Sequence, residues 1–287
     1  MDRILTGTVF GGHARVAVIT LTDAVNEEIK LHDLSPLSAA ALGRTMTAGA
    51  YLGANLKNKE DVFSISVKGS GCIGGVVVAG NGDGTLRGYV ANPHAELPLK
   101  ANGHLDVGQG IGPGTITVCK DLGLKEPYNG TCELVTGEIA EDFAEYLAKS
   151  EGISSAVALG VLNDKNGCRA AGGVIVEAMP GITEDMLVIL EDVMSNFGAV
   201  STVLSEKTPE EIFDFYFAHL DAEVFPAKEL KVKCSCGQEK IENALISIGK
   251  EECENIIKEH GKIEVSCHFC EKKYVFTQDD VERIWGK

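Results

Sequence analysis

Four cysteines near the C-terminal end of the sequence have the spacing of a metal-binding site. Cys234 and Cys236 form a C-S-C motif, and Cys267 and Cys270 form a C-H-F-C motif, with 30 residues between the two. Zinc binds four thiolates tetrahedrally at about 2.3 Å, and two tight turns can supply these ligands in pairs. We therefore predict one zinc ion per chain, held by the four cysteines. Unrelated free thiols are the alternative, and His268 inside the second motif could replace one thiolate.

Four protein ligands would leave the metal no open coordination position, so we expect a structural or regulatory ion rather than a hydrolytic one. Two helices, at about 239–248 and 250–259, are expected to bring the motifs together. Structural zinc contributes about 10–16 kcal/mol in small modules, whereas whole domains are stable by only about 5–15 kcal/mol. Loss of zinc is therefore expected to unfold this small C-terminal segment.

The same sulfurs could act as a redox sensor. Zinc holds them as thiolates, and four neighbouring lysines would favour the reactive anionic form: Lys231, Lys233, Lys272 and Lys273. Peroxide or hypochlorous acid can oxidise such thiolates to sulfenic acids and then to disulfides, with release of the metal. An inert zinc ribbon that is never oxidised remains the alternative.

Five further cysteines have no spacing that suggests a site, and we expect them to be buried thiols: Cys72, Cys119, Cys132, Cys168 and Cys253. Because Cys253 lies between the two motifs, it could also join mixed disulfides with them.

The elements that must position these residues follow from the apolar pattern. Strand-like runs joined by glycine-rich turns lie at 15–21, 61–68, 74–80, 85–91 and 115–123. One helix is expected to interrupt them after Ser35 and Pro36, which suit the N-cap and the first helical position. A second helix is expected at 137–150. The sum predicts an α+β fold, with a large N-terminal β-sheet domain and helices packed against it.

The segment 178–232 has a composition of its own and is expected to be a helical linker. Residues 178–230 carry two Lys against eleven Asp and Glu, and they contain five of the ten Phe in the chain. Thr208, Pro209 and Glu211 form a helix-start pattern. Two interpretations stay open: an amphipathic pair of helices packed permanently on the sheet, or a marginally stable linker that covers apolar surface in one state and releases it in another.

Composition and missing motifs exclude several functions. The net charge of −16 disfavours nucleic acid and anionic membranes as partners. The first ten residues lack a secretion signal, and no run of about 18 apolar residues occurs, so a cytoplasmic location is expected. The G-x-G-x-x-G pattern at 69–74 leads into a strand rather than a helix, and no P-loop, G-x-S-x-G or H-E-x-x-H motif is present. We therefore expect a protein that is not an enzyme.

The C-S-C motif, the helical insert and the C-H-F-C motif at the end of a long α+β chain together resemble the heat shock protein 33 family of redox-regulated chaperones. The likeness extends over nearly the whole chain. It includes the stretches SAAALGRTMTAGAYLGANLK, LRGYVANPHAELP, LDVGQGIGPGTITVCKDLG, TGEIAEDFAEYLAKSE and IENALISIGKEE, the last followed by IEVSCHFCEKKYVF. One departure is Gly152, where Gln is expected.

The resemblance implies an ATP-independent holdase chaperone that is zinc-bound and inactive when reduced. Oxidation would pair Cys234 with Cys236 and Cys267 with Cys270. Release of zinc would then unfold the C-terminal module and the linker, and the exposed apolar surface would bind unfolded or partly unfolded client proteins, often in a homodimer. On this chain, the resemblance assigns 1–177 to a client-binding core, 178–232 to the linker and 233–287 to the redox switch. A zinc-ribbon interaction scaffold without redox switching is the competing hypothesis.

Overall fold

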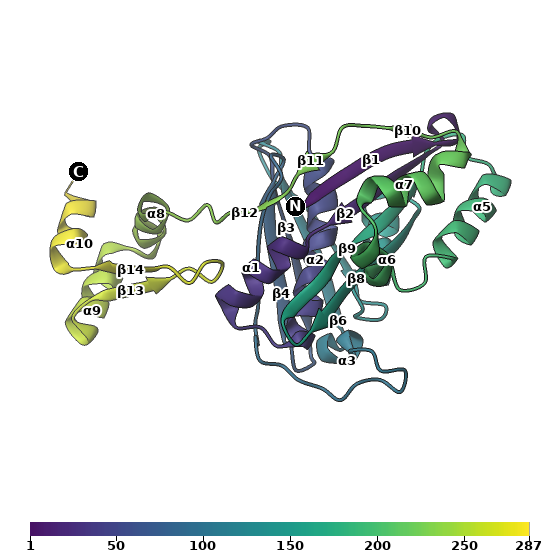
Figure 1. Ribbon diagram of the computed structural model, residues 1–287. Helices are drawn as coiled ribbons and strands as arrows, with labels where there is room; N and C mark the ends of the chain where they lie inside the picture. The colour runs from purple at the N-terminus through teal and green to yellow at the C-terminus, as the bar shows by residue number, and fades with distance from the viewer. Residues whose placement is uncertain (287) are drawn as a thin grey trace. The chain divides into compact units, whose positions relative to one another are not determined.

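The computed structural model describes residues 1–286, which form two compact units divided between Val232 and Lys233. The first unit contains two antiparallel-rich sheets, here called sheet A and sheet B (Figure 1). Sheet A has the order β10-β1-β2-β9-β8, and β11 also pairs with β1. Its strands are β1 (Arg3–Val9), β2 (Ala14–Thr20), β8 (Ser155–Asp164), β9 (Gly167–Ala178), β10 (Glu223–Val224) and β11 (Lys228–Glu229).

Sheet B has the order β12-β5-β4-β3-β6-β7. Its strands are β3 (Val62–Gly69), β4 (Gly75–Asn81), β5 (Thr85–Val90), β6 (Gly114–Asp121), β7 (Tyr128–Glu133) and β12 (Lys231–Val232). All neighbours in sheet B are antiparallel except β12, which runs parallel to β5. Four of these strands, β3 to β6, and β2 of sheet A contain the five runs that the sequence predicted. The α+β prediction is thus confirmed in this region, although the pattern did not reveal β1 or β7.

Helix α2 (Pro36–Ala54) contacts strands of both sheets and is buried over almost its whole length. Its N-cap is the predicted Ser35, whose hydroxyl accepts a hydrogen bond from the Ser38 amide. Small residues let the strands approach closely: a Cβ on Gly49 would lie 3.0 Å from side-chain atoms of Phe63 and Val78. The Ala- and Gly-rich sequence of α2 therefore produces a helix that is surrounded by sheet rather than amphipathic.

Sheet A is covered on both faces. Alternate residues of β2 point in opposite directions: Ala17 and Ile19 join the core around α2, whereas Val16 and Val18 join a second apolar cluster. That second cluster is closed by α5 (Glu184–Ser195), α6 (Val200–Glu206) and α7 (Pro209–Phe217), drawn in green in Figure 1. Helices α5 to α7 therefore cover apolar strand residues that would otherwise face water.

The linker prediction of a helical segment holds only for its first part. After α7 and the short 3₁₀ turn η3 (Ala218–Leu220), the chain turns at Asp221 and becomes extended. Residues 223–232, here called the strap, form β10 and β11 on sheet A and then β12 on sheet B. The extended form arises because the strap satisfies its backbone groups on the edges of two sheets, a tertiary effect that local helix signals do not contain.

The prediction of a single helix before residue 123 was also wrong. Two more occur, α1 (Thr22–His32) and α3 (Val107–Ile111). Helix α1 lacks a strong apolar stripe because two of its buried positions are charged or polar: Glu28 and His32 contact each other with 3.3 Å between Oε2 and Nε2. Glu28 also accepts a hydrogen bond from the Gly88 amide of β5. A buried glutamate–histidine pair takes the place that apolar residues fill in most core helices.

A short 3₁₀ turn, η1 (Phe10–Gly12), connects β1 and β2. The predicted helix at 137–150 is present as α4 (Ala140–Tyr146), which is followed by a π-helical turn, η2 (Leu147–Glu151). The fully buried Asp142 fixes the start of α4. Its Oδ1 accepts hydrogen bonds from the amides of Val135, Thr136 and Gly137, and its Oδ2 accepts one from Ile139. One carboxylate thus satisfies four amides that the loop leaves without backbone partners.

The second unit begins at Lys233 and is small. It contains α8 (Gln238–Ile248), α9 (Lys250–His260), the hairpin β13 (Ile263–Ser266) and β14 (Lys273–Phe276), and α10 (Gln278–Trp285). The two predicted helices are confirmed as α8 and α9. Seven buried residues make its core: Leu245, Cys253, Ile263, Tyr274, Phe276, Val281 and Ile284. So small a core is typical of modules that need a metal or a disulfide for stability.

Within residues 1–286, no single helix is long and apolar enough to cross a membrane, and only α5 and α6, taken as one pair bent by 71°, meet the length and composition for it.

Candidate metal centre

The structure brings the four predicted cysteines together at one point. Cys234 and Cys236 lie on the chain before α8, and Cys267 and Cys270 lie in the turn between β13 and β14. All four Sγ atoms lie within 4.8 Å of one another. Two close contacts join the motifs crosswise: the Sγ atoms of Cys234 and Cys267 are 3.7 Å apart, and those of Cys236 and Cys270 are 3.3 Å apart. The four cysteines are therefore placed to hold one metal ion.

The sulfur spacing fits the ion that the sequence suggested. A tetrahedral site with bonds of about 2.3 Å separates its sulfurs by roughly 3.8 Å, close to the two short distances. The group that could hold a metal consists of cysteines alone, and His268 lies exposed outside it. All nine cysteines, which lie within the described residues, carry free thiols.

Backbone hydrogen bonds hold the second motif in a tight turn. The amide of Cys267 donates to the carbonyl of Lys272, and the amides of Cys270 and Glu271 both donate to the carbonyl of Cys267. Glu271 adopts a positive φ of 56°, an uncommon conformation for a residue with a side chain. The hairpin thus presents both of its sulfurs from one turn.

Two hydrogen bonds reach the sulfurs of the first motif. The Cys236 amide donates to Sγ of Cys234 at 3.4 Å. The Tyr274 hydroxyl, from β14, donates to Sγ of Cys236 at 3.1 Å. Burial raises the pKa of Cys236, but hydrogen bonds from Tyr274 and the neighbouring thiols outweigh this effect and lower that pKa to about 7. Burial raises the pKa of Cys234 to about 12.

Most of the flanking lysines have partners other than the cysteine sulfurs, whose thiolate form the sequence suggested they would favour. Lys231 forms an ion pair with Glu229, and Lys273 forms one with Glu264. The Lys272 ammonium lies 5.2 Å from the centre of the Tyr274 ring, in a cation–π contact. Nearby carboxylates and an aromatic face take up these charges, a pairing that sequence proximity to the cysteines cannot reveal.

The other cysteines are only partly as predicted. Cys132, Cys168 and Cys253 are buried, but Cys119 is half-buried and Cys72 is exposed. Cys119 lies on the face of β6 that points away from α2, and Cys72 lies in the glycine-rich turn between β3 and β4. The Cys253 thiol is fully buried and directed to the carbonyl of Leu245, so it is a core residue of the second unit.

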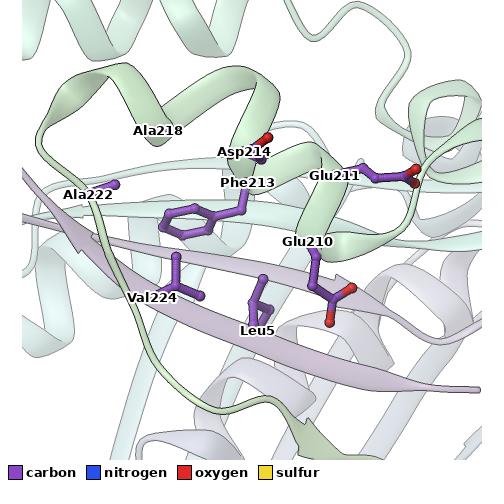
Figure 2. Close-up of a pocket in the computed structure, with 8 residues that line it drawn as sticks. All are labelled: Leu5, Glu210, Glu211, Phe213, Asp214, Ala218, Ala222 and Val224. Atoms are coloured by element: carbon purple, nitrogen blue, oxygen red, sulfur yellow. The ribbon is translucent and has the colours of Figure 1, made fainter.

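A separate groove lies between α7 and sheet A in the first unit (Figure 2). Its volume is about 520 Å³. Apolar side chains line it from both sides, among them Leu5 and Val224 from the sheet and Phe213 from α7. The Phe213 ring rests on Gly7 of β1, where an added Cβ would lie 2.5 Å from its Cζ. Three carboxylates of α7 also border the groove: Glu210, Glu211 and Asp214.

Comparison with known proteins agrees with this arrangement. The family model described as Hsp33 protein matches residues 2–277. The chain belongs to the Hsp33 family. It is 42% identical over 287 residues to the 33 kDa chaperonin of Clostridium perfringens strain SM101, a match that covers 99% of this chain and 91% of the relative. It is 41% identical over 286 residues to the 33 kDa chaperonin of Clostridium beijerinckii, covering 99% and 98% of the two chains.

A solved Hsp33 structure has the same fold. The crystal structure of the 33 kDa chaperonin (heat shock protein 33 homolog) from Thermotoga maritima superposes with a TM-score of 0.90 at 36% identity, covering 99% of this chain and 97% of that one. The Hsp33 family consists of chaperones rather than enzymes, as the resemblance implied. Sequence reasoning found the four sulfurs of this Hsp33 chain but missed Tyr274, whose place beside Cys236 depends on the β13–β14 hairpin.

Proposed function

We propose that this Hsp33 family member is a redox-regulated, ATP-independent holdase chaperone of the cytoplasm. Reduced, it would hold one zinc ion through Cys234, Cys236, Cys267 and Cys270 and be inactive. The observation that carries the proposal is the cluster of four free sulfurs within 4.8 Å of one another in a chain of this family.

The chemistry of the proposed switch needs only these sulfurs and a peroxide. One thiolate attacks a peroxide oxygen, the O–O bond breaks, and a sulfenic acid and hydroxide are formed. The neighbouring thiolate of the same motif then displaces hydroxide from the sulfenic sulfur and forms the disulfide. Formation of each disulfide, Cys234–Cys236 or Cys267–Cys270, thus transfers two electrons to one hydrogen peroxide, which leaves as two waters once protons are added. A disulfide sulfur is a poor metal ligand, so zinc would leave.

Loss of zinc would unfold the second unit because its own core is small. Seven buried residues stabilise it, one of which, Tyr274, contacts a ligand sulfur. A contribution of about 10–16 kcal/mol from zinc exceeds what such a core supplies by itself. The domain roles then follow as proposals: 233–287 is the switch, 178–232 the linker and 1–177 the client-binding core.

Release of the linker would expose a surface for client binding. Helices α5 to α7 cover one apolar face of sheet A, and their departure would expose strand residues such as Val16, Val18 and Val174. Segment 178–230 carries a net charge of −9, from two Lys and eleven Asp and Glu, and this self-repulsion lowers the cost of releasing it. Unfolded or partly unfolded proteins are the proposed partners, and the oxidised form is proposed to act as a homodimer.

The test combines metal release with chaperone activity. The purified, reduced protein should contain one zinc per chain, and hydrogen peroxide should release it, form two disulfides and create the ability to suppress light scattering by a thermally unfolding enzyme. A thiol reductant with added zinc should reverse these changes. The double variant Cys234→Ser, Cys236→Ser should lose redox control, whereas Cys72→Ser, at an exposed cysteine outside the cluster, should behave like wild type. Zinc release that leaves light scattering unchanged would support a zinc-ribbon scaffold instead.

A further inference from the structure

Tyr274 connects the two halves of the sulfur cluster. It lies on β14, four residues after Cys270, and its hydroxyl reaches Sγ of Cys236 in the first motif at 3.1 Å. The two residues are 38 positions apart in the sequence. The bond therefore ties the chain before α8 to the hairpin that carries the other pair of sulfurs.

Packing in the core fixes the position of the Tyr274 ring, so its hydroxyl is directed at the Cys236 sulfur. Its side chain is buried among the core residues of the second unit and is 7% exposed. On the neighbouring strand, Val265 is its register partner, two residues before Cys267. A buried tyrosine hydroxyl needs a hydrogen-bond partner, and here that partner is a sulfur of the cluster.

The bond distinguishes the reduced from the oxidised sulfur. A hydroxyl donates strongly to a thiolate, because charged acceptors make the stronger hydrogen bonds, but a disulfide sulfur is neutral and a weak acceptor. The hydrogen bond also withdraws electron density from the lone pair of the Cys236 sulfur, which is the electron pair that would attack a peroxide. It should therefore stabilise the reduced state and slow the first oxidative step at Cys236.

We propose that Tyr274 is a positioning residue that holds Cys236 in the geometry of a metal ligand and protects its thiolate from oxidation. This inference rests on the proposed zinc and redox function and adds a residue that sets how tightly the metal is held and how much oxidant is needed. Outer hydrogen bonds to metal ligands typically change metal affinity by about 10–100-fold.

The test is the variant Tyr274→Phe in the full chain, because phenylalanine keeps the ring in the core and removes only the donor. The matched control is Tyr128→Phe, which removes a hydroxyl that donates to the Ser150 carbonyl at 2.6 Å in the first unit. Three properties are measured for wild type and both variants: zinc affinity by competition with a chelating dye, the sulfur-to-metal charge-transfer bands after replacement of zinc by Co²⁺, and the rate of zinc release in hydrogen peroxide.

Tyr274→Phe should bind zinc at least 10-fold more weakly, shift the Co²⁺ charge-transfer bands and release zinc about fivefold faster in peroxide, the loss expected for one hydrogen bond of about 1 kcal/mol. Tyr128→Phe should match wild type in all three. If wild type binds zinc and responds to peroxide, but Tyr274→Phe shows the same affinity, spectrum and release rate, the role of Tyr274 is refuted and the proposed switch stands. If wild type itself binds no zinc, the proposed function fails first.

Discussion

Replacing Phe213 by alanine should release α7 from sheet A without any oxidant. The Phe213 side chain is 1% exposed, its ring rests against Gly7 of β1, and it lies 5.6 Å from the ring of Phe217. Figure 2 shows the Phe213 ring between α7 and the strands of sheet A. Alanine at this position would enlarge the groove that already lies beside it.

The magnitude follows from burial. Three large side chains of α7 are fully buried, Ile212, Phe213 and Phe217, and each contributes about 1.5–3 kcal/mol by leaving water. A buried Phe→Ala change costs about 3–5 kcal/mol, including the cavity that remains. Because a tenfold change in an equilibrium corresponds to about 1.4 kcal/mol, the open form of α7 should become at least about 100-fold more populated.

Hydrogen exchange measures this opening directly. In the reduced, zinc-loaded variant, amides of residues 210–217 should exchange about 100-fold faster, whereas those of β3 in sheet B should keep their protection. If the covered face of sheet A binds clients, the same sample should also suppress light scattering by a thermally unfolding enzyme. The matched control is Phe215→Ala, because Phe215 is on the same helix but 66% exposed.

Two outcomes would refute parts of this reasoning. Equal exchange rates in Phe213→Ala and Phe215→Ala would show that Phe213 does not fasten α7 to the sheet. Faster exchange in Phe213→Ala without any suppression of light scattering would show that the surface under α7 is not the one that binds clients.

Two further predictions concern the stability of the first unit. Desolvation raises the pKa of Glu138, but hydrogen bonds from Lys100 and Arg44 outweigh this effect and hold that pKa below the usual value. Ionised Glu138 therefore contributes fully to the stability of the folded state above the ordinary carboxyl pKa. This contribution is lost as the pH falls through the lowered pKa of the folded state. Glu138→Gln should therefore unfold about 1–3 kcal/mol more easily at pH 7 and approach wild type in acid; a deficit independent of pH in urea titrations would contradict this. Asp142→Asn should lose about 2–3 kcal/mol, because an amide has one oxygen where the carboxylate accepts from four backbone amides; thermal unfolding at the wild-type temperature would contradict it.

Much of the fold could be predicted where local signals and tertiary demands agree. Ser35 and Pro36 mark the start of α2, and Thr208 with Glu211 forms the predicted capping box of α7. The strands β8 and β9 were missed, although β9 is one of the most buried strands. Its continuous apolar sequence does not alternate because both faces of sheet A are covered, so the period of two that identifies a half-exposed strand is absent.

The candidate site was predictable in its ligands but not in its surroundings. Cys234, Cys236, Cys267 and Cys270 are identified by spacing alone, since two short motifs are what a tetrahedral metal requires. The partners of the nearby lysines and the bond from Tyr274 depend on which strand faces which sulfur. Such contacts arise from the pairing of β13 with β14, and no short motif in the sequence encodes them.

The strap has a consequence for the order in which the linker would open. Its three pairings, β12 on sheet B and then β11 and β10 on sheet A, are each only two residues long. Lys233 alone separates β12 from Cys234. Disorder that starts at the sulfur cluster would meet β12 first, β11 and β10 next, and α7 last. Brief oxidation of the cluster would then detach only a few strap residues, which can pair again with the sheets. Only lasting oxidation would reach α7. The order of the elements along the chain would therefore make the protein insensitive to short pulses of oxidant.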